Sequence, residues 1–275
     1  MPALHEGQLR VAMKLAENGK TVVESRIQRF PLRTTVPMYV DPHDPGFAFL
    51  YEQNPSGAVF SGDDLTTELV AGPGTRVHLT TQSATKLHRM DGGRGRHPFS
   101  FAVADGAYLE YLPDLLIPQA GSSLRQVTTV SVEPGGSYLG AETVSPGRAQ
   151  NGELFEYGEL DLETRIESAG ELLACDRMRL RGDKRGSALG RKPYLSTIIF
   201  AEPDAEGDST GAAIEAELGD AGLRDVSAAG ALPNGAGTIV RALSASADEA
   251  RAVVDTVWAT VRRRRLGLPL PRTRK

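Results

Sequence analysis

The residues whose spacing first suggests chemistry are Ser83 and Lys86, in the run Ser83-Ala84-Thr85-Lys86. A serine and a lysine at this spacing form S-x-x-K, the nucleophile signature of serine penicillin-recognising enzymes. That chemistry needs the serine at the start of a buried helix, with S-D-N and K-T-G elements downstream, and neither tripeptide occurs here. The preceding RVHLTT alternates like a strand. A serine hydrolase or transpeptidase that uses Ser83 therefore remains only as an alternative from a different functional class.

Other catalytic motifs fail on sequence order or spacing. Gly207–Gly211 matches the G-x-S-x-G nucleophile elbow, but that fold needs a later histidine, and the last histidine is His97. Gly19-Lys20-Thr21 lacks the second glycine of a P-loop, because position 14 is a lysine. Cys175 is the only cysteine, and no two histidines have helical metal-ligand spacing. The sequence thus predicts a binding or chaperone protein that is not an enzyme and has no permanent metal or cofactor.

Composition narrows the class of partner and the compartment. The chain has 31 Lys+Arg against 35 Asp+Glu, a net charge of −4, so no basic bias indicates nucleic acid. No apolar run approaches the length of a membrane span, and the first residues lack the apolar region of a signal peptide. A single cysteine fits a reducing compartment. We expect a cytoplasmic protein that does not bind nucleic acid or a membrane.

The elements that must position any site are mostly strands. Residues 8–30 alternate apolar and polar residues on both sides of Asn18-Gly19, which predicts a hairpin. Four later strand–turn–strand segments align on Gly74, Gly106, Gly136 and Gly170, at spacings of 32, 30 and 34 residues. A period near 30 in a strand-only region is typical of stacked, solenoid-like coils, but evenly spaced hairpins of a sandwich would also give it. Both readings stay open on this pattern.

Three acidic residues follow the same repeat. Counted from the aligned glycines, Glu110 is at +4 and Glu142 and Asp176 are at +6, so all three have one parity and are predicted to share a sheet face. A carboxylate on an apolar face must be paired, hydrogen-bonded or next to a wet cavity. These acids therefore either line a hydrophilic passage or, as the residues alone favour, pair with arginines. The candidate partners are Arg125, Arg148 and Arg177.

The character of the sequence changes after residue 192. Residues 1–192 are predicted to form a β body, and residues 193–275 an α+β region packed on it as one structural unit. Residues 211–222 are predicted to form a short helix. Residues 246–265 read as an amphipathic helix that Ser246 or Asp248 caps, with acids in its first turn and arginines in its last.

Six motifs together resemble one known family, the urease accessory protein UreD, also called UreH. They follow in order from near the N-terminus to the end of the chain: VFSGDDL (59–65), LTTQSATKLHR (79–89), LEYLPDLLIP (109–118), SPGRAQNGELF (145–155), LLACDRMRL (172–180) and VWATVRRRRLGLPLPR (257–272). The resemblance implies a mainly β fold, a β-helix-like stack of strands and hairpins with two C-terminal α-helices. It also implies a urease maturation chaperone that works with UreF and, through UreF, with UreG, docks on apo-urease and helps deliver nickel.

The resemblance assigns roles to particular residues. Ni²⁺ would be in transit rather than permanently bound, and Asp63, Asp176, Glu110 and Glu142 would face an acidic internal passage. Lys86 is the motif lysine, and a buried Lys86 beside Asp63 or Glu110 would balance charge there. Trp258 and Arg272, in the closing motif, are assigned to partner binding. Pure scaffolding, with structural carboxylates and no nickel conduit, is the alternative within the family.

Overall fold

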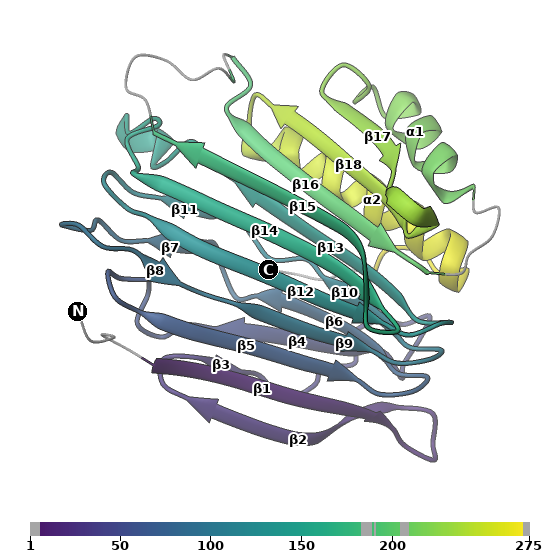
Figure 1. Ribbon diagram of the computed structural model, residues 1–275. Helices are drawn as coiled ribbons and strands as arrows, with labels where there is room; N and C mark the ends of the chain where they lie inside the picture. Colours follow the sequence, from purple (N-terminus) through teal and green to yellow (C-terminus); the bar gives the residue numbers. More distant parts are fainter. Residues whose placement is uncertain (1–5, 183–188, 190, 204–208, 272–275) are drawn as a thin grey trace.

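The chain winds between two β-sheets, and each turn of the winding adds one strand to each sheet. The computed structural model describes residues 6–182, 189, 191–203 and 209–271. Figure 1 shows the two sheets stacked face to face, with both helices on the outer side of one of them. This is a mainly β, solenoid-like stack of coils with two helices near the C-terminus, as the sequence predicts.

Sheet A has the order β15-β14-β12-β8-β5-β1-β2, and β9 pairs with β5 and β12. Its central strands run parallel, while β1–β2 and β14–β15 are antiparallel hairpins. The strands are β1 (Glu6–Leu15), β2 (Thr21–Arg29), β5 (Asp64–Ala71), β8 (Gly95–Arg96), β9 (Phe99–Val103), β12 (Leu124–Val132), β14 (Glu159–Ser168) and β15 (Glu171–Arg181).

Sheet B has the order β17-β18-β16-β13-β10-β6-β4-β3, with β7 and β11 paired to each other at its margin. β4, β6, β10 and β13 are parallel, and the later strands join antiparallel. The strands are β3 (Arg33–Thr34), β4 (Ala48–Gln53), β6 (Arg76–Thr81), β7 (Thr85–Leu87), β10 (Tyr108–Tyr111), β11 (Leu116–Pro118), β13 (Ser137–Val144), β16 (Tyr194–Ala201), β17 (Ser227–Ala231) and β18 (Gly237–Ser244). The expected boundary near residue 193 thus falls within one continuous sheet.

Stacked turns carry the chain from sheet A to sheet B. The register places Arg76, Tyr108 and Ser137 side by side, so that the equivalent turn glycines are Gly74, Gly106 and Gly135. All three have positive φ, between 65° and 80°, a conformation that glycine adopts without strain. The sequence alignment on Gly136 was therefore wrong by one residue. Gly170 also differs, because it lies in the β14–β15 hairpin within sheet A.

The hairpin and both helices form where the sequence predicts them. β1 and β2 flank a turn at Gly19, whose φ is 77°. The helices are α1 (Thr210–Asp220) and α2 (Ala247–Leu266), and two short 3-10 turns cover Ala149–Asn151 and Pro233–Gly235. The Ser246 hydroxyl caps α2 by accepting a hydrogen bond from the Glu249 amide at 3.1 Å.

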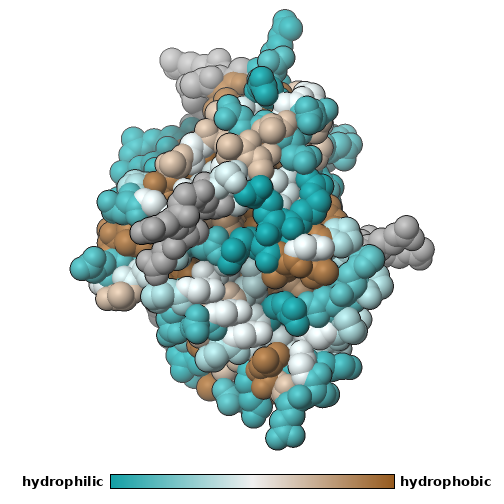
Figure 2. Space-filling view, turned by 90° about the vertical axis from the view of Figure 1, so that its right-hand side faces the viewer, coloured by the Kyte–Doolittle hydropathy of each residue, from teal (hydrophilic) through white to brown (hydrophobic). Residues whose placement is uncertain are grey.

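Two hydrophobic cores hold the layers together. One lies between the sheets and is built by inward side chains such as Leu50, Leu69 and Phe101. The other lies between sheet B and the helices, where Val253, Val257 and Val261 of α2 pack on outward side chains of the sheet. The face in Figure 2 has hydrophobic side chains in small separate groups among hydrophilic ones. Polar side chains inside either core therefore need a specific reason to be there.

Candidate functional site: a polar cavity between the sheets

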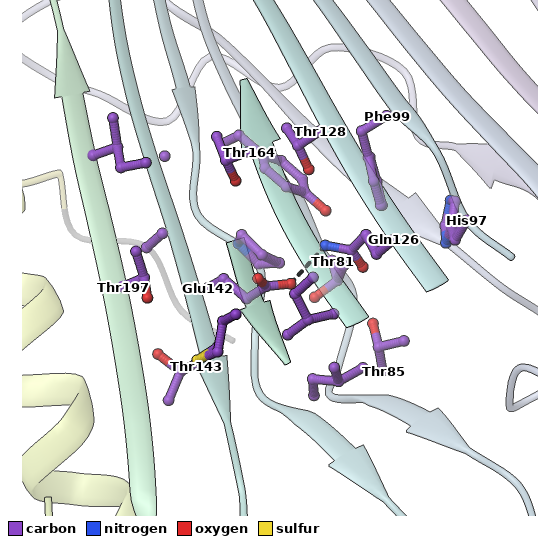
Figure 3. Close-up of a pocket in the computed structure, with 18 of the residues that line it drawn as sticks. Thr81, Thr85, His97, Phe99, Gln126, Thr128, Glu142, Thr143, Thr164 and Thr197 are labelled. Atoms are coloured by element: carbon purple, nitrogen blue, oxygen red, sulfur yellow. Dashed lines mark hydrogen bonds between the residues drawn. The ribbon is translucent and has the colours of Figure 1, made fainter. Parts of the chain in front are cut away.

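A polar cavity interrupts the core between the two sheets. Its volume is about 60 Å³, and roughly 10–15 Å³ of such space is enough for one water molecule. Threonine hydroxyls and acidic groups form much of its wall, and Figure 3 shows several of these threonines together with Glu142. The polar lining residues are Glu52, Thr81, Thr85, His97, Asp114, Gln126, Thr128, Glu142, Thr143, Thr164, Asp176 and Thr197. The cavity can thus hold water or a hydrated cation inside the fold.

Glu142 lies in the middle of this cavity. It extends inward from β13, and its Oε1 accepts a hydrogen bond of 2.5 Å from Nε2 of Gln126 on β12 (Figure 3). Burial raises the pKa of Glu142 to about 7, although the Gln126 hydrogen bond lowers it in part. The charge of Asp176 adds to the rise. The charge of Arg241 lowers this pKa in part. Among the described residues the hydrogen bond to Glu142 comes from the neutral Gln126 amide, so the carboxylate is available to a cation.

Asp176 lines the same cavity from β15. Its carboxylate forms an ion pair with Arg241 of β18, whose Nη1 also donates to the Thr197 hydroxyl at 2.8 Å. Glu142 and Asp176 therefore line one cavity, but from strands of sheets B and A rather than from the one sheet face that the count from the glycines predicts. Asp176 has an arginine partner, but Arg241 is none of the three arginines proposed from the sequence.

Glu110 lies elsewhere, on the outer face of sheet B beneath α2. Its side chain is fully buried, accepting from Arg262 Nη1 at 3.0 Å and lying 2.7 Å from His78 Nδ1. Arg262 also pairs with Asp41 and packs its guanidinium over the Phe47 ring at 4.8 Å. Burial pushes the pKa of Glu110 up, but His78 and Arg262 together hold it below its ordinary value. The residue is the centre of a buried ion network that fastens α2 to the sheet.

The predicted shared face of Glu110 and Glu142 is therefore wrong, and register explains the error. Glu110 pairs with Leu139, which belongs to the core under the helices. Glu142 is three residues further along β13 and so faces the opposite way. Because Gly135, rather than Gly136, is the equivalent of Gly106, the count from the glycines was shifted by one residue, and a shift of one exchanges the two faces.

Asp63 and Lys86 do not line this cavity, although Lys86 lines a second one described below. Asp63 is buried in the turn before β5, where its Oδ2 accepts a hydrogen bond from the Phe60 amide at 2.9 Å. Lys86 is exposed on β7, so the predicted buried lysine beside Asp63 or Glu110 is wrong. Ser83 lies in an exposed bend between β6 and β7, and strand β7 follows it rather than the helix that a nucleophilic S-x-x-K serine requires.

Sequence reasoning missed two cavity residues, Glu52 and His97. Glu52 follows Ala48 and Leu50 on the inward face of β4, and His97 precedes Phe99 and Phe101 on the inward side of β9. In both segments, every second residue belongs to an apolar face, and the polar residue occupies the next position on that face. This alternation could have identified both residues from the sequence.

A second cavity, of about 150 Å³, adjoins the first. Glu52, Thr81, Thr85 and His97 line both cavities. The second one extends toward the exposed segment that contains Ser83 and Lys86. We call this second cavity the vestibule.

The residues assigned to partner binding lie on or beyond α2. Trp258 is 8% exposed, its ring stacks on His78 at 5.1 Å, and it lines a groove between α2 and the loop after β10. Arg272 lies outside the described residues. Partner binding by either residue stays a prediction.

Among the described residues, no group of three or more His, Cys, Asp and Glu side chains is placed to hold a metal ion. In the same part of the chain, no helix is long and apolar enough to cross a membrane. The cavity thus offers pairs of polar groups rather than a closed coordination shell.

Comparison with known sequences identifies the family. The chain matches the family described as UreD urease accessory protein over residues 5–275. The chain belongs to the UreD family. It is 36% identical to the urease accessory protein UreD of Mycolicibacterium gilvum, over 95% of this chain and 96% of that protein. It is 35% identical to urease accessory protein UreD 2 of Streptomyces griseus, over 94% of this chain and 89% of the relative. Family membership implies a role in urease maturation.

Proposed function

We propose that the protein is a non-catalytic chaperone that passes Ni²⁺ through the cavity between its sheets to apo-urease. In this proposal it acts in the cytoplasm, in a complex with UreF and, through UreF, with UreG. The names of its relatives, urease accessory proteins, support the client. Nickel is the cargo, so the protein needs to hold it only in passing.

The observation that carries the proposal is Glu142. Its side chain is half-buried beside a cavity that has room for water, and among the described residues its hydrogen-bond partner is the neutral Gln126. A buried carboxylate without a cation is costly, and a passing divalent cation would remove that cost. Asp176 and several threonine hydroxyls add oxygen donors within the same wall.

The chemistry of the wall suits transit rather than storage. Apart from His97, the polar groups of the wall offer carboxylate, hydroxyl and amide oxygens, which are hard ligands and hold Ni²⁺ less tightly than a site built from several imidazoles or thiolates. The ion pair of Asp176 with Arg241 further weakens attraction at that point, because the guanidinium already balances the aspartate charge.

The test is activation of apo-urease in cells that supply nickel and the other accessory proteins. We would compare the wild type with Glu142→Gln and Asp176→Asn, which remove one charge each and keep the shape of the side chain. Glu171→Gln, exposed on the same strand as Asp176, is the matched control. We expect activation by the wild type and the control, and a large loss in the cavity variants with partner co-purification intact.

The other outcomes separate the alternatives. Full activation by both cavity variants would show a scaffold with structural carboxylates. Failure of the wild type itself, with all partners present, would refute a role in the maturation of that urease.

A further inference from the structure

Glu52 and His97 meet where the vestibule joins the inner cavity. Glu52 Oε1 lies 3.7 Å from His97 Nε2, and the Thr67 hydroxyl lies 3.0 Å from the same nitrogen. Glu52 and His97 are each 5% exposed, and both line the two cavities. Glu52 and His97 therefore lie between the vestibule and the inner cavity, together with Thr81 and Thr85.

One oxygen of the pair lacks a partner. Glu52 Oε2 is buried and accepts no hydrogen bond from the described residues. A buried carboxylate oxygen without a donor is costly, so groups of this kind usually have a water, an ion or a functional reason. The oxygen belongs to a residue that lines two cavities, which leaves space for such a species beside it.

We propose that Glu52 and His97 form a second cation site, which selects transition-metal ions such as Ni²⁺ over Mg²⁺ and Ca²⁺ at the entrance to the inner cavity. The identity of the cargo rests on the proposed function, whereas the site and its selectivity rest on these residues.

The ligand distance fits one shared ion. First-row ions bind imidazole nitrogen and carboxylate oxygen at roughly 2.0–2.2 Å, so two ligands of one ion lie about 3 to 4.2 Å apart, depending on their angle. The separation of 3.7 Å between Oε1 and Nε2 falls in that interval. It is too long for a hydrogen bond between the two groups.

Selectivity follows from the nitrogen donor. His97 is the only histidine among the described residues that line either cavity. Imidazole suits Ni²⁺ and its neighbours in the series, whereas Mg²⁺ and Ca²⁺ prefer oxygen ligands alone. A neutral imidazole binds such ions through the lone pair of one ring nitrogen.

The hydrogen bond between Thr67 and His97 keeps the site weak. A cation at Nε2 must displace the Thr67 hydroxyl from that nitrogen. Two protein ligands and this displacement give binding that is selective but reversible, which a point of transit requires.

The first test needs no variant and no urease. The full-length chain, labelled with ¹⁵N-histidine, is titrated with Co²⁺, which is paramagnetic and broadens the signals of nearby nuclei. We expect the ring signals of His97 to broaden before those of the exposed His43, and a hundredfold excess of Mg²⁺ to leave the broadening in place. Sharp His97 signals while His43 broadens, or full displacement by Mg²⁺, would overturn the proposal.

The second test uses activation of apo-urease against nickel concentration. We expect Glu52→Gln and His97→Asn to raise the nickel concentration for half-maximal activation roughly tenfold, in the range seen when metal-site partners are lost, and to keep the maximum. His43→Asn and Glu171→Gln are the matched controls, and thermal unfolding checks that each variant is folded.

The two proposals can fail separately. An unchanged nickel dependence in folded Glu52 and His97 variants, with loss of activation in the Glu142 and Asp176 variants, overturns the selective site and leaves the passage. Normal activation by all four variants overturns both. Broadening of His97 in the isolated chain would then still report a cation site, but one without a part in urease maturation, and the selective entrance would be refuted.

Discussion

Glu142 should make the folded protein less stable as the pH rises, and Glu142→Gln should remove that loss. The pKa of Glu142 is raised from 4.5 to about 7 by burial, so between these values the folded state holds a proton that the unfolded state releases. Stability falls with pH wherever the folded state binds more protons. The contribution of Glu142 is therefore most favourable below pH 4.5 and is lost as the pH rises through about 7.

The size of the effect follows from the shift. One pKa unit corresponds to about 1.4 kcal/mol, so a rise of roughly 2.5 units corresponds to about 3 kcal/mol at pH 8. Glutamine keeps the size of the side chain and an oxygen that can accept from Gln126. The free energy of unfolding of the variant should thus match that of the wild type near pH 4.5 and exceed it by about 1–3 kcal/mol at pH 8.

Urea unfolding followed by circular dichroism at several pH values between 4.5 and 8 measures this difference. The Glu171→Gln variant, which alters an exposed glutamate, should follow the wild type at every pH. A gain that does not change with pH, or a Glu142→Gln variant that is less stable at pH 8, would show that Glu142 is compensated by charge and is not an available ligand.

Four further outcomes are expected. Arg262→Met should reduce the free energy of unfolding by about 3–5 kcal/mol, because it leaves Glu110 buried without its cation; urea unfolding measures the loss. Lys86→Met should change stability by less than about 0.5 kcal/mol, since the side chain is exposed, and a larger change in the thermal midpoint would contradict that placement. Asp63→Ala should lower stability by about 1 kcal/mol through loss of the bond to the Phe60 amide, again measured with urea. A fluorophosphonate probe should label neither the wild type nor Ser83→Ala, and labelling of the wild type alone would restore the hydrolase alternative.

The sequence predicts the fold better than it predicts the site. Local patterns define the β1–β2 hairpin at Gly19 and the Ser246 cap of α2, because both depend on residues that are close in sequence. The period near 30 residues also indicates the stacking. The choice between stacked coils and a sandwich depends on strand pairing between distant segments, which alternation alone does not determine.

The site was harder because inward and outward residues differ by one position. The glycine alignment was right between Gly74 and Gly106 and wrong by one at Gly136, and this placed Glu110 on the face of Glu142. Alternation within a single strand predicts the inward side chains more reliably than alignment between coils. Glu52 continues the apolar face of Ala48 and Leu50, and a comparison within one strand needs no alignment between coils.

Compensation of charge, rather than burial, separates the structural acids from the candidate functional ones. Glu110 is fully buried and Glu142 half-buried, and both extend from strands of sheet B, yet their pKa values shift in opposite directions. Arg262 and His78 satisfy both oxygens of Glu110, so a cation there would compete with a guanidinium that is itself fully buried. Glu142 has an amide partner and a cavity beside it. Binding of a divalent cation would therefore stabilise the protein most where no arginine or lysine forms an ion pair with the carboxylate, and among the described residues neither Glu142 nor Glu52 has such an ion pair.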